Sequence, residues 1–229
     1  MAFTVEQQDC LYWLGRYTER VYTTVKQFSD YFDRMIDESD TKYIDFCASL
    51  EIPNIYSSRE DFIERYCGDE SNPDSIISNL MRGFDNALIL REILGTDAFS
   101  YIQLAVYSMR GAAQSGSPLI DLQRVCDHIL SFWGVVDDSV IEDRARDLIK
   151  TGRRVERVDL YGRMHASEEV MRTSIHRLTS YRLVRSGLGC RPERIQALEK
   201  IASVEPMDYN AIVYEVENIF NDGNPARHY

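Results

Sequence analysis

The chain has 229 residues, 44% hydrophobic and 28% charged, a balance that predicts a folded globular protein and excludes a mainly disordered one. Its net charge of -11 and pI near 4.9 disfavour general binding to nucleic acid or to anionic lipid surfaces. Five scattered cysteines with no C-x-x-C pair, no signal-like N-terminus and no apolar run of about 20 residues together lead us to expect a cytoplasmic protein with reduced thiols and no membrane span.

A long helix is predicted first, over residues 5–38. Apolar residues recur there at alternating steps of three and four from Leu14 to Met35, which is the spacing of a helix seam. Residues 10–14 place apolar side chains on every side of the helix. This end is therefore expected to be buried all round.

Shorter helices follow, over 42–50 and 59–66, and the segment CGDESNPD is the clearest loop. After Pro73, either Asp74 or Ser75 supplies a cap for a helix that runs to about residue 94, where Gly95 breaks it.

The remainder of the chain also has helical patterns. Asp137, Asp138 and Ser139 are interpreted as caps of a long helix over 140–165. The other predicted helices cover 97–114, 119–136, 168–186, 191–201 and 208–220. No segment alternates with period two, so we predict an all-α fold, an antiparallel multi-helix bundle. It is expected to be one domain over 1–221 with a flexible tail at 222–229.

One motif occurs twice. Residues 15–21 read GRYTERV and residues 152–158 read GRRVERV, so the copies are 137 positions apart. The repetition predicts a pseudo-symmetric pair of long helices. Glycine inside a helix costs about 1 kcal/mol relative to alanine, so Gly15 and Gly152 are expected where another backbone approaches closely.

Two interpretations of the repeated charges remain open. In the first, Glu19 and Glu156 pair with arginines and fix the register of the bundle as a buried ionic network. In the second, the two motifs line a cleft, in which the glutamates are catalytic and the arginines bind an anionic substrate. The arginines concerned are Arg16, Arg20, Arg153 and Arg157.

Three stretches carry a family resemblance: LYWLGRYTERV, NPDSIISNLMRGFDNALILREIL and FWGVVDDSVIEDRARDLIKTGRRVERVD. Together they resemble the bacterial Alpha-E domain family, over roughly residues 5–165. By position, the resemblance adds further residues to the expected substrate-binding set: Tyr12, Asn86, Arg91, Glu92 and Asp159.

The resemblance also implies partners, because members of the family typically accompany an ATP-grasp amide ligase and a transglutaminase-like protein. We therefore expect a component of a system that makes or modifies a small peptide, with the Glu/Arg cleft binding an anionic or amino-acid-like substrate. The alternative is a non-catalytic helical adaptor for the ligase, in which the motifs are purely structural. Enzymatic activity, cofactors and homo-oligomer formation are left open.

Other candidate sites are weaker. His165 and Glu169 stand one helical turn apart, but no second histidine follows at ligand spacing, so no metal site is expected. Cys10 has no histidine near it in sequence and is interpreted as a small buried thiol.

Overall fold

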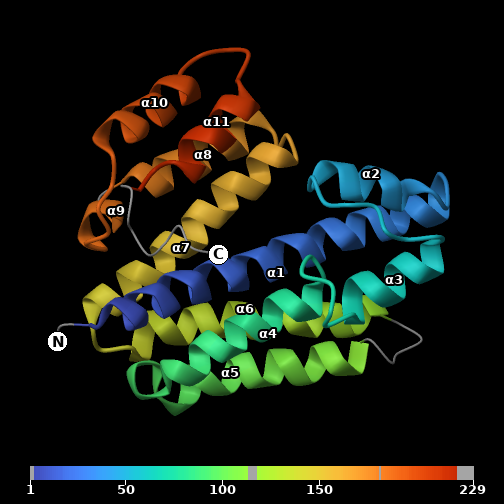
Figure 1. The fold of residues 1–229 in the computed structure, drawn as a ribbon, viewed down its shortest axis with the longest axis horizontal. Helices are drawn as coiled ribbons and strands as arrows, with labels where there is room; N and C mark the ends of the chain where they lie inside the picture. The colour runs from blue at the N-terminus through green and yellow to red at the C-terminus, as the bar shows by residue number, and fades with distance from the viewer. Residues whose placement is uncertain (1–2, 113–117, 181, 221–229) are drawn as a thin grey trace. The chain divides into compact units, whose positions relative to one another are not determined.

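The computed structural model describes residues 3–112, 118–180 and 182–220 (Figure 1). Every regular element in these ranges is a helix, apart from one isolated antiparallel bridge between Cys190 and Phe220. The prediction of an all-α helical bundle is confirmed. The chain divides into two compact units, one of Met1–Glu19 with Ile141–Tyr229 and the other of Arg20–Val140. The predicted tail at 222–229 lies outside the described residues.

Helix α1 spans Val5–Asp37, close to the predicted 5–38. Leu14, Val21 and Phe28 of its seam are fully buried. All residues from 10 to 14 are buried as well, which confirms that apolar side chains on every side of a helix mark an enclosed end. Residues up to Glu19 belong to the first unit, and the remainder of α1 belongs to the second.

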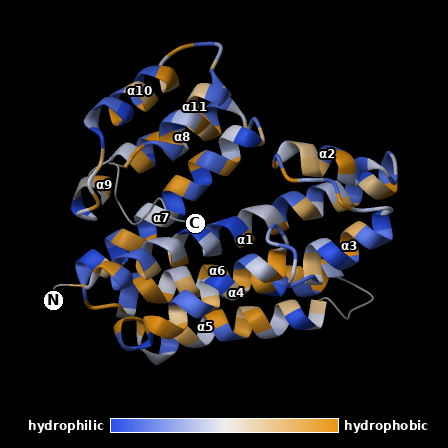
Figure 2. Ribbon diagram, viewed as in Figure 1, coloured by the Kyte–Doolittle hydropathy of each residue, from blue (hydrophilic) through white to orange (hydrophobic). Residues whose placement is uncertain are grey.

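The second unit combines the later part of α1 with five helices: α2 (Lys42–Ser49), α3 (Arg59–Gly68), α4 (Ile76–Ile89), α5 (Arg91–Ala112) and α6 (Pro118–Ser139). An aromatic cluster joins α1, α2 and α3, where the ring of Phe28 lies 6.4 Å from that of Phe46 and 5.6 Å from that of Phe62. Helices α5 and α6 pack side by side. Hydrophobic residues alternate with hydrophilic ones around these helices (Figure 2), as packing on one face requires.

Two turn signals in the second unit act as the sequence predicted. The Ser75 side chain accepts a hydrogen bond from the backbone N–H of Ser78 and caps α4. Gly95 adopts φ 75° and ψ 170°, outside the helical region, so it interrupts α5 where a break was expected. The structure adds an earlier break, because α4 already ends at Ile89.

The predicted caps at Asp137, Asp138 and Ser139 are wrong. These residues form the last turn of α6, and the next helix, α7, begins only at Asp143. The apolar seam of α6 explains the difference, because Val136 is 1% exposed and packs the end of the helix against the core, while Val140, also 1% exposed, is buried directly after the helix ends.

The first unit is built around α7 (Asp143–Arg163). It also contains the start of α1 and four helices: α8 (Glu168–Thr179), α9 (Arg182–Arg185), α10 (Pro192–Ala202) and α11 (Tyr209–Glu217). Helices α8 and α11 both pack on α7. None of the helices in the described part of the chain combines the length and apolarity needed to cross a membrane.

Candidate functional site

The two repeated motifs meet within the first unit, where α7 crosses the start of α1 at their glycines. A Cβ atom on Gly15 would lie 2.0 Å from the carbonyl oxygen of Ile149, and one on Gly152 would lie 1.9 Å from that of Tyr12. Both distances are far below any real carbon–oxygen contact. The prediction that the glycines mark a close backbone approach is therefore confirmed.

The crossing is pseudo-symmetric. Positions 137 apart have corresponding roles, since Ile149 is the counterpart of Tyr12 just as Gly152 is that of Gly15. Each glycine packs against a backbone carbonyl of the other helix, and that carbonyl belongs to the residue three positions before the other helix's own glycine. At both points the backbone of the other helix occupies the space that a side chain would need.

Ion pairs repeat the same symmetry. Arg16 on α1 donates from Nε to Glu156 Oε2 at 2.5 Å, and Arg153 on α7 donates from Nε to Glu19 Oε2 at 2.9 Å. Arg157 also binds Glu19, from Nε to Oε1 at 2.5 Å and from Nη2 to Oε2 at 3.0 Å. Each helix thus supplies a buried carboxylate to a guanidinium of the other helix.

Burial distinguishes the carboxylates from the guanidiniums. Glu19 and Glu156 are 0% exposed. The side chains of Arg16, Arg153 and Arg157 are 13%, 27% and 21% exposed. A buried carboxylate with no partner would be strongly destabilising, so these guanidiniums are what make the burial of both glutamates tolerable.

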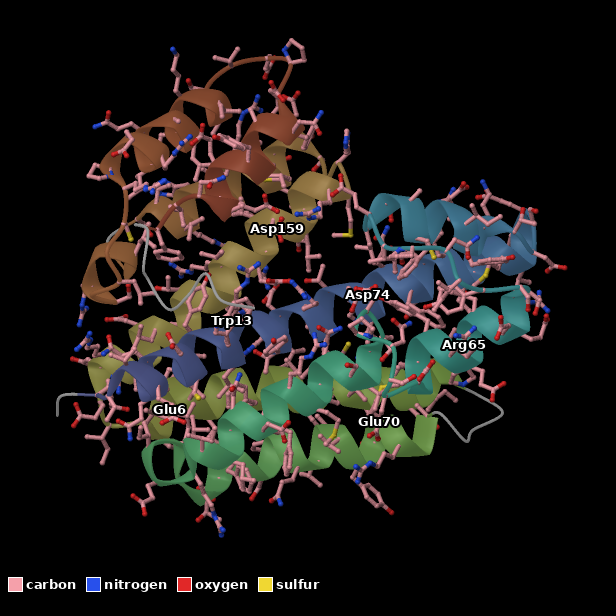
Figure 3. The ribbon with its side chains drawn as sticks, viewed as in Figure 1. Glu6, Trp13, Arg65, Glu70, Asp74 and Asp159 are labelled. Atoms are coloured by element: carbon pink, nitrogen blue, oxygen red, sulfur yellow. The ribbon has the colours of Figure 1, made fainter. Side chains whose placement is uncertain are left out.

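A chain of charges extends the network across α7. Asp159 accepts from Arg16 Nη2 at 3.4 Å and from Arg163 Nε at 3.0 Å. Arg163 in turn donates from Nη2 to Glu217 of α11 at 2.5 Å. Figure 3 labels Asp159 on α7 and Trp13 on α1, the two helices that hold the network. The buried centre is therefore tied to the half-exposed Glu217 through alternating charges.

Tyr12 lies at one side of the ion-pair network, between Arg16 and Phe220. Its hydroxyl accepts a hydrogen bond from Arg16 Nη1 at 3.5 Å, and its ring packs edge-on against Phe220 at 5.5 Å. Burial raises the pKa of Tyr12 to about 12, against the opposing effect of Arg16, so the hydroxyl stays protonated at neutral pH. Burial alone would lower the pKa of Arg16, but Glu156 and the other neighbouring acidic groups raise it above its usual value.

The structure brings together seven of the predicted site residues: Tyr12, Arg16, Glu19, Arg153, Glu156, Arg157 and Asp159. The other four belong to the second unit. There Arg20 is half-buried on α1 and Asn86 is half-buried on α4, while Arg91 and Glu92 are exposed at the start of α5. The guanidinium of Arg91 lies 5.6 Å from the ring centroid of Phe99.

Sequence reasoning missed three contributors. Arg163 stands four residues after Asp159 on the same helix, so the spacing of the pair was a usable signal. Glu217 and Phe220 lie about 60 residues after the second copy of the motif, and no local pattern connects them to it. Only the packing of the C-terminal segment against α1 and α7 reveals their part.

The weaker candidates are also placed. Cys10 is 7% exposed, so its interpretation as a buried thiol is confirmed. His165 and Glu169 do not share a helical turn, because α7 ends at Arg163 and α8 starts at Glu168. The His165 ring instead stacks on Tyr209 at 4.7 Å. Among the described residues, no three His, Cys, Asp or Glu side chains gather as a metal site would require.

Comparison with known proteins gives one result. A family model described as a predicted alpha-helical domain with a conserved ER motif matches residues 7–168. The Glu-Arg dipeptides at 19–20 and 156–157 lie in this range, and both of their glutamates belong to the buried network. Neither a curated protein nor a solved structure matches the chain.

Proposed function

Because the chain belongs to the Alpha-E family, we propose that it is a non-catalytic helical adaptor in an ATP-grasp- and transglutaminase-associated system that makes or modifies a small peptide. The choice of system depends on the proteins that members of this family typically accompany, an ATP-grasp amide ligase and a transglutaminase-like protein. The adaptor role is supported by one observation, the complete burial of Glu19 and Glu156 against arginines of the opposite helix.

A carboxylate can act as a base or bind a substrate only if the substrate reaches it. Glu19 has both oxygens engaged by guanidiniums, and neither glutamate has any exposed surface. Opening such a pair means separating two charges in a medium where water does not compensate, which is costly. We therefore assign the paired motifs to fixing the crossing of α1 and α7.

The test replaces each buried glutamate by its neutral isostere, Glu19→Gln or Glu156→Gln, with Glu64→Gln as the control because Glu64 is exposed on α3. Breaking a buried pair costs about 3–5 kcal/mol, and the partial exposure of the guanidiniums reduces the expected loss of unfolding free energy to about 2–3 kcal/mol. The control should change by less than about 0.5 kcal/mol.

Function is measured on the same variants as binding to a purified ATP-grasp amide ligase of the kind that this proposal names as partner, at a temperature where each variant is folded. The adaptor proposal expects binding, and the output of the ligase, to be retained despite the lower stability. Full stability combined with loss of output would show that the glutamates take part in chemistry, and the adaptor proposal would fail.

A second candidate is a site for an anionic or amino-acid-like substrate, with Glu19 and Glu156 as catalytic groups. The observation in its favour is that Glu19 faces two guanidiniums, those of Arg153 and Arg157, each partly exposed. Calorimetric titration with L-glutamate and with inorganic phosphate tests this candidate. Binding that is lost in Arg153→Lys, with unfolding unchanged, would favour it, because lysine keeps the charge but not the planar fork of donors.

A further inference from the structure

Polar side chains are buried at the start of α4, in the second unit. Ser75 and Asn79 are 0% and 3% exposed, and Asn72 in the preceding loop is 7% exposed. All three belong to the stretch NPDSIISN, one of the segments that carry the family resemblance. This stretch takes no part in the crossing of α1 and α7, which belongs to the first unit. Its buried polar groups therefore need an explanation of their own.

The side-chain amide of Asn79 is only half satisfied. Its Nδ2 donates to the carbonyl oxygens of Ser75 at 2.8 Å and Pro73 at 3.2 Å. These carbonyls precede the first turn of α4, and helical side chains lean toward the N-terminus, so the amide is directed at the start of the helix. Its Oδ1 is buried and has no hydrogen-bond partner within the described part of the chain. A buried acceptor without a donor is costly, so this atom indicates a ligand that donates a hydrogen bond.

Two backbone donors lie at the same end of α4. Ile76 and Ile77 are its first two residues and are 1% and 3% exposed. Their N–H groups precede the first hydrogen bond of the helix, and no acceptor for them is present in the ranges that the structure describes. The N–H of the next residue, Ser78, is bound by the cap Ser75. Two buried donors at the positive end of the helix dipole favour a negatively charged acceptor at this point.

Arg82 adds a positive charge where the helix by itself disfavours one. Its Nη1 donates to the carbonyl oxygen of Pro73 at 3.5 Å, so the exposed guanidinium lies beside the Asn79 amide, which binds the same oxygen. A cation near the N-terminus of a helix is unfavourable, because the dipole is positive there. Among the described residues Arg82 has no ion-pair partner, although this unit contains 20 acidic and 10 basic residues. An anion at this end of α4 would compensate both the dipole and the guanidinium.

We propose that the N-terminus of α4 binds a small oxyanion that carries a hydroxyl group, and that inorganic hydrogen phosphate is the ion that fits. Its oxygens accept hydrogen bonds from the N–H groups of Ile76 and Ile77 and from Arg82. Its hydroxyl donates to Asn79 Oδ1. The site goes beyond the adaptor function proposed above, since none of its residues belongs to the first unit.

The need for a proton on the ligand defines its chemical class. Sulfate has no proton to donate near neutral pH. A phosphate monoester has a second pKa of about 6, so it has lost most of its last proton at pH 7.5. Hydrogen phosphate keeps one proton at that pH and satisfies both the donors and the acceptor of the site.

Two features limit the affinity of this site. Asn79 Oδ1 is buried, so the ion must enter past the long, exposed side chain of Arg82. Asp74, labelled in Figure 3, precedes the cap and is half-buried, and its carboxylate repels an anion. We therefore expect a dissociation constant in the millimolar range and a ligand no larger than phosphate.

Titration of the full chain with inorganic phosphate at pH 7.5, followed by calorimetry and by two-dimensional NMR, tests the site. Phosphate should shift the amide signals of Ile76 and Ile77. Sulfate and O-phosphoserine are titrated in the same way, and each should bind about tenfold more weakly, because neither donates a hydrogen bond to Asn79.

One substitution tests the guanidinium. Arg82→Gln should weaken phosphate binding about tenfold, because a charge-assisted hydrogen bond is lost. Arg124→Gln is the matched control, since Arg124 is also exposed, lies on α6 of the same unit and changes the net charge equally. Both variants should fold, and thermal unfolding without phosphate checks this.

Three results would overturn the proposal. If phosphate leaves the signals of Ile76 and Ile77 unchanged, water alone satisfies the start of α4 and there is no anion site. If sulfate binds as tightly as phosphate, Asn79 does not select a hydroxyl and the ligand class is wrong. If Arg82→Gln and Arg124→Gln weaken binding equally, the attraction is diffuse. None of these results bears on the adaptor function, whose own test measures binding to a ligase.

Discussion

Replacing Gly152 by alanine should separate the two motif helices. The new Cβ would lie 1.9 Å from the carbonyl oxygen of Tyr12, whereas an ordinary contact begins near 3.4 Å, so the backbones must move apart by about 1.5 Å. A side chain could rotate away, but a carbonyl within a helix is fixed by its own hydrogen bond. The shift would also stretch the pair of Arg16 with Glu156, now at 2.5 Å.

The expected magnitude combines two opposing effects. Overpacking costs about 1–3 kcal/mol, and the rigid backbone obstacle at Gly152 places the loss at the upper end. The better helix propensity of alanine offsets about 1 kcal/mol. We therefore expect Gly152→Ala to lower the free energy of unfolding by about 2 kcal/mol. Urea denaturation followed by far-UV circular dichroism measures it.

Two other glycines provide matched comparisons. Gly134 lies within α6, and apart from its chain neighbours and the nearby backbone of its own helix no described atom comes within 4 Å of the position that an added Cβ would take, so Gly134→Ala should gain up to about 1 kcal/mol. At Gly162 a Cβ would meet the Val213 side chain at 2.7 Å, an obstacle that can adjust, so the loss should be smaller than at Gly152. If Gly152→Ala is as stable as Gly134→Ala, the helices are not held by this close crossing.

Two further predictions follow from the buried titratable groups. Tyr12 has a pKa near 12 in the folded chain against 10.0 when unfolded, so its contribution to stability is complete below about pH 10 and is lost as the pH rises toward 12. In Tyr12→Phe the loss of unfolding free energy over that range should be shallower, and an unchanged slope would contradict the assignment. Burial raises the pKa of all five thiols, to about 12 for Cys67 and about 11 for Cys190, so Ellman's reagent at neutral pH should react slowly with the native protein and count five thiols after unfolding. A fast-reacting native thiol would show that this burial is not maintained in solution.

Much of the fold could be read from local patterns. The seam from Leu14 to Met35, the Ser75 cap and the Gly95 break are each determined by a few neighbouring residues, because periodicity, capping and positive φ are local properties of the chain. The prediction that residues 137–139 cap a helix was wrong because it, too, used only neighbouring residues. Local polarity suggested a boundary there, but α6 continues to Ser139, with Val136 buried in its last turns.

The candidate site, like the fold, could be predicted only in part from the local sequence. The sequence by itself identified Gly15 and Gly152 as points of close approach, because a glycine inside a helix has a cost that requires an explanation. It left two roles open for Glu19 and Glu156, members of a buried ionic network or catalytic groups in a cleft. Which arginine meets which glutamate was decided by the crossing of α1 and α7. The roles of Glu217 and Phe220 were likewise decided only by tertiary packing, since contacts between residues far apart in the chain depend on how helices are placed in space and leave no periodic signal in the sequence.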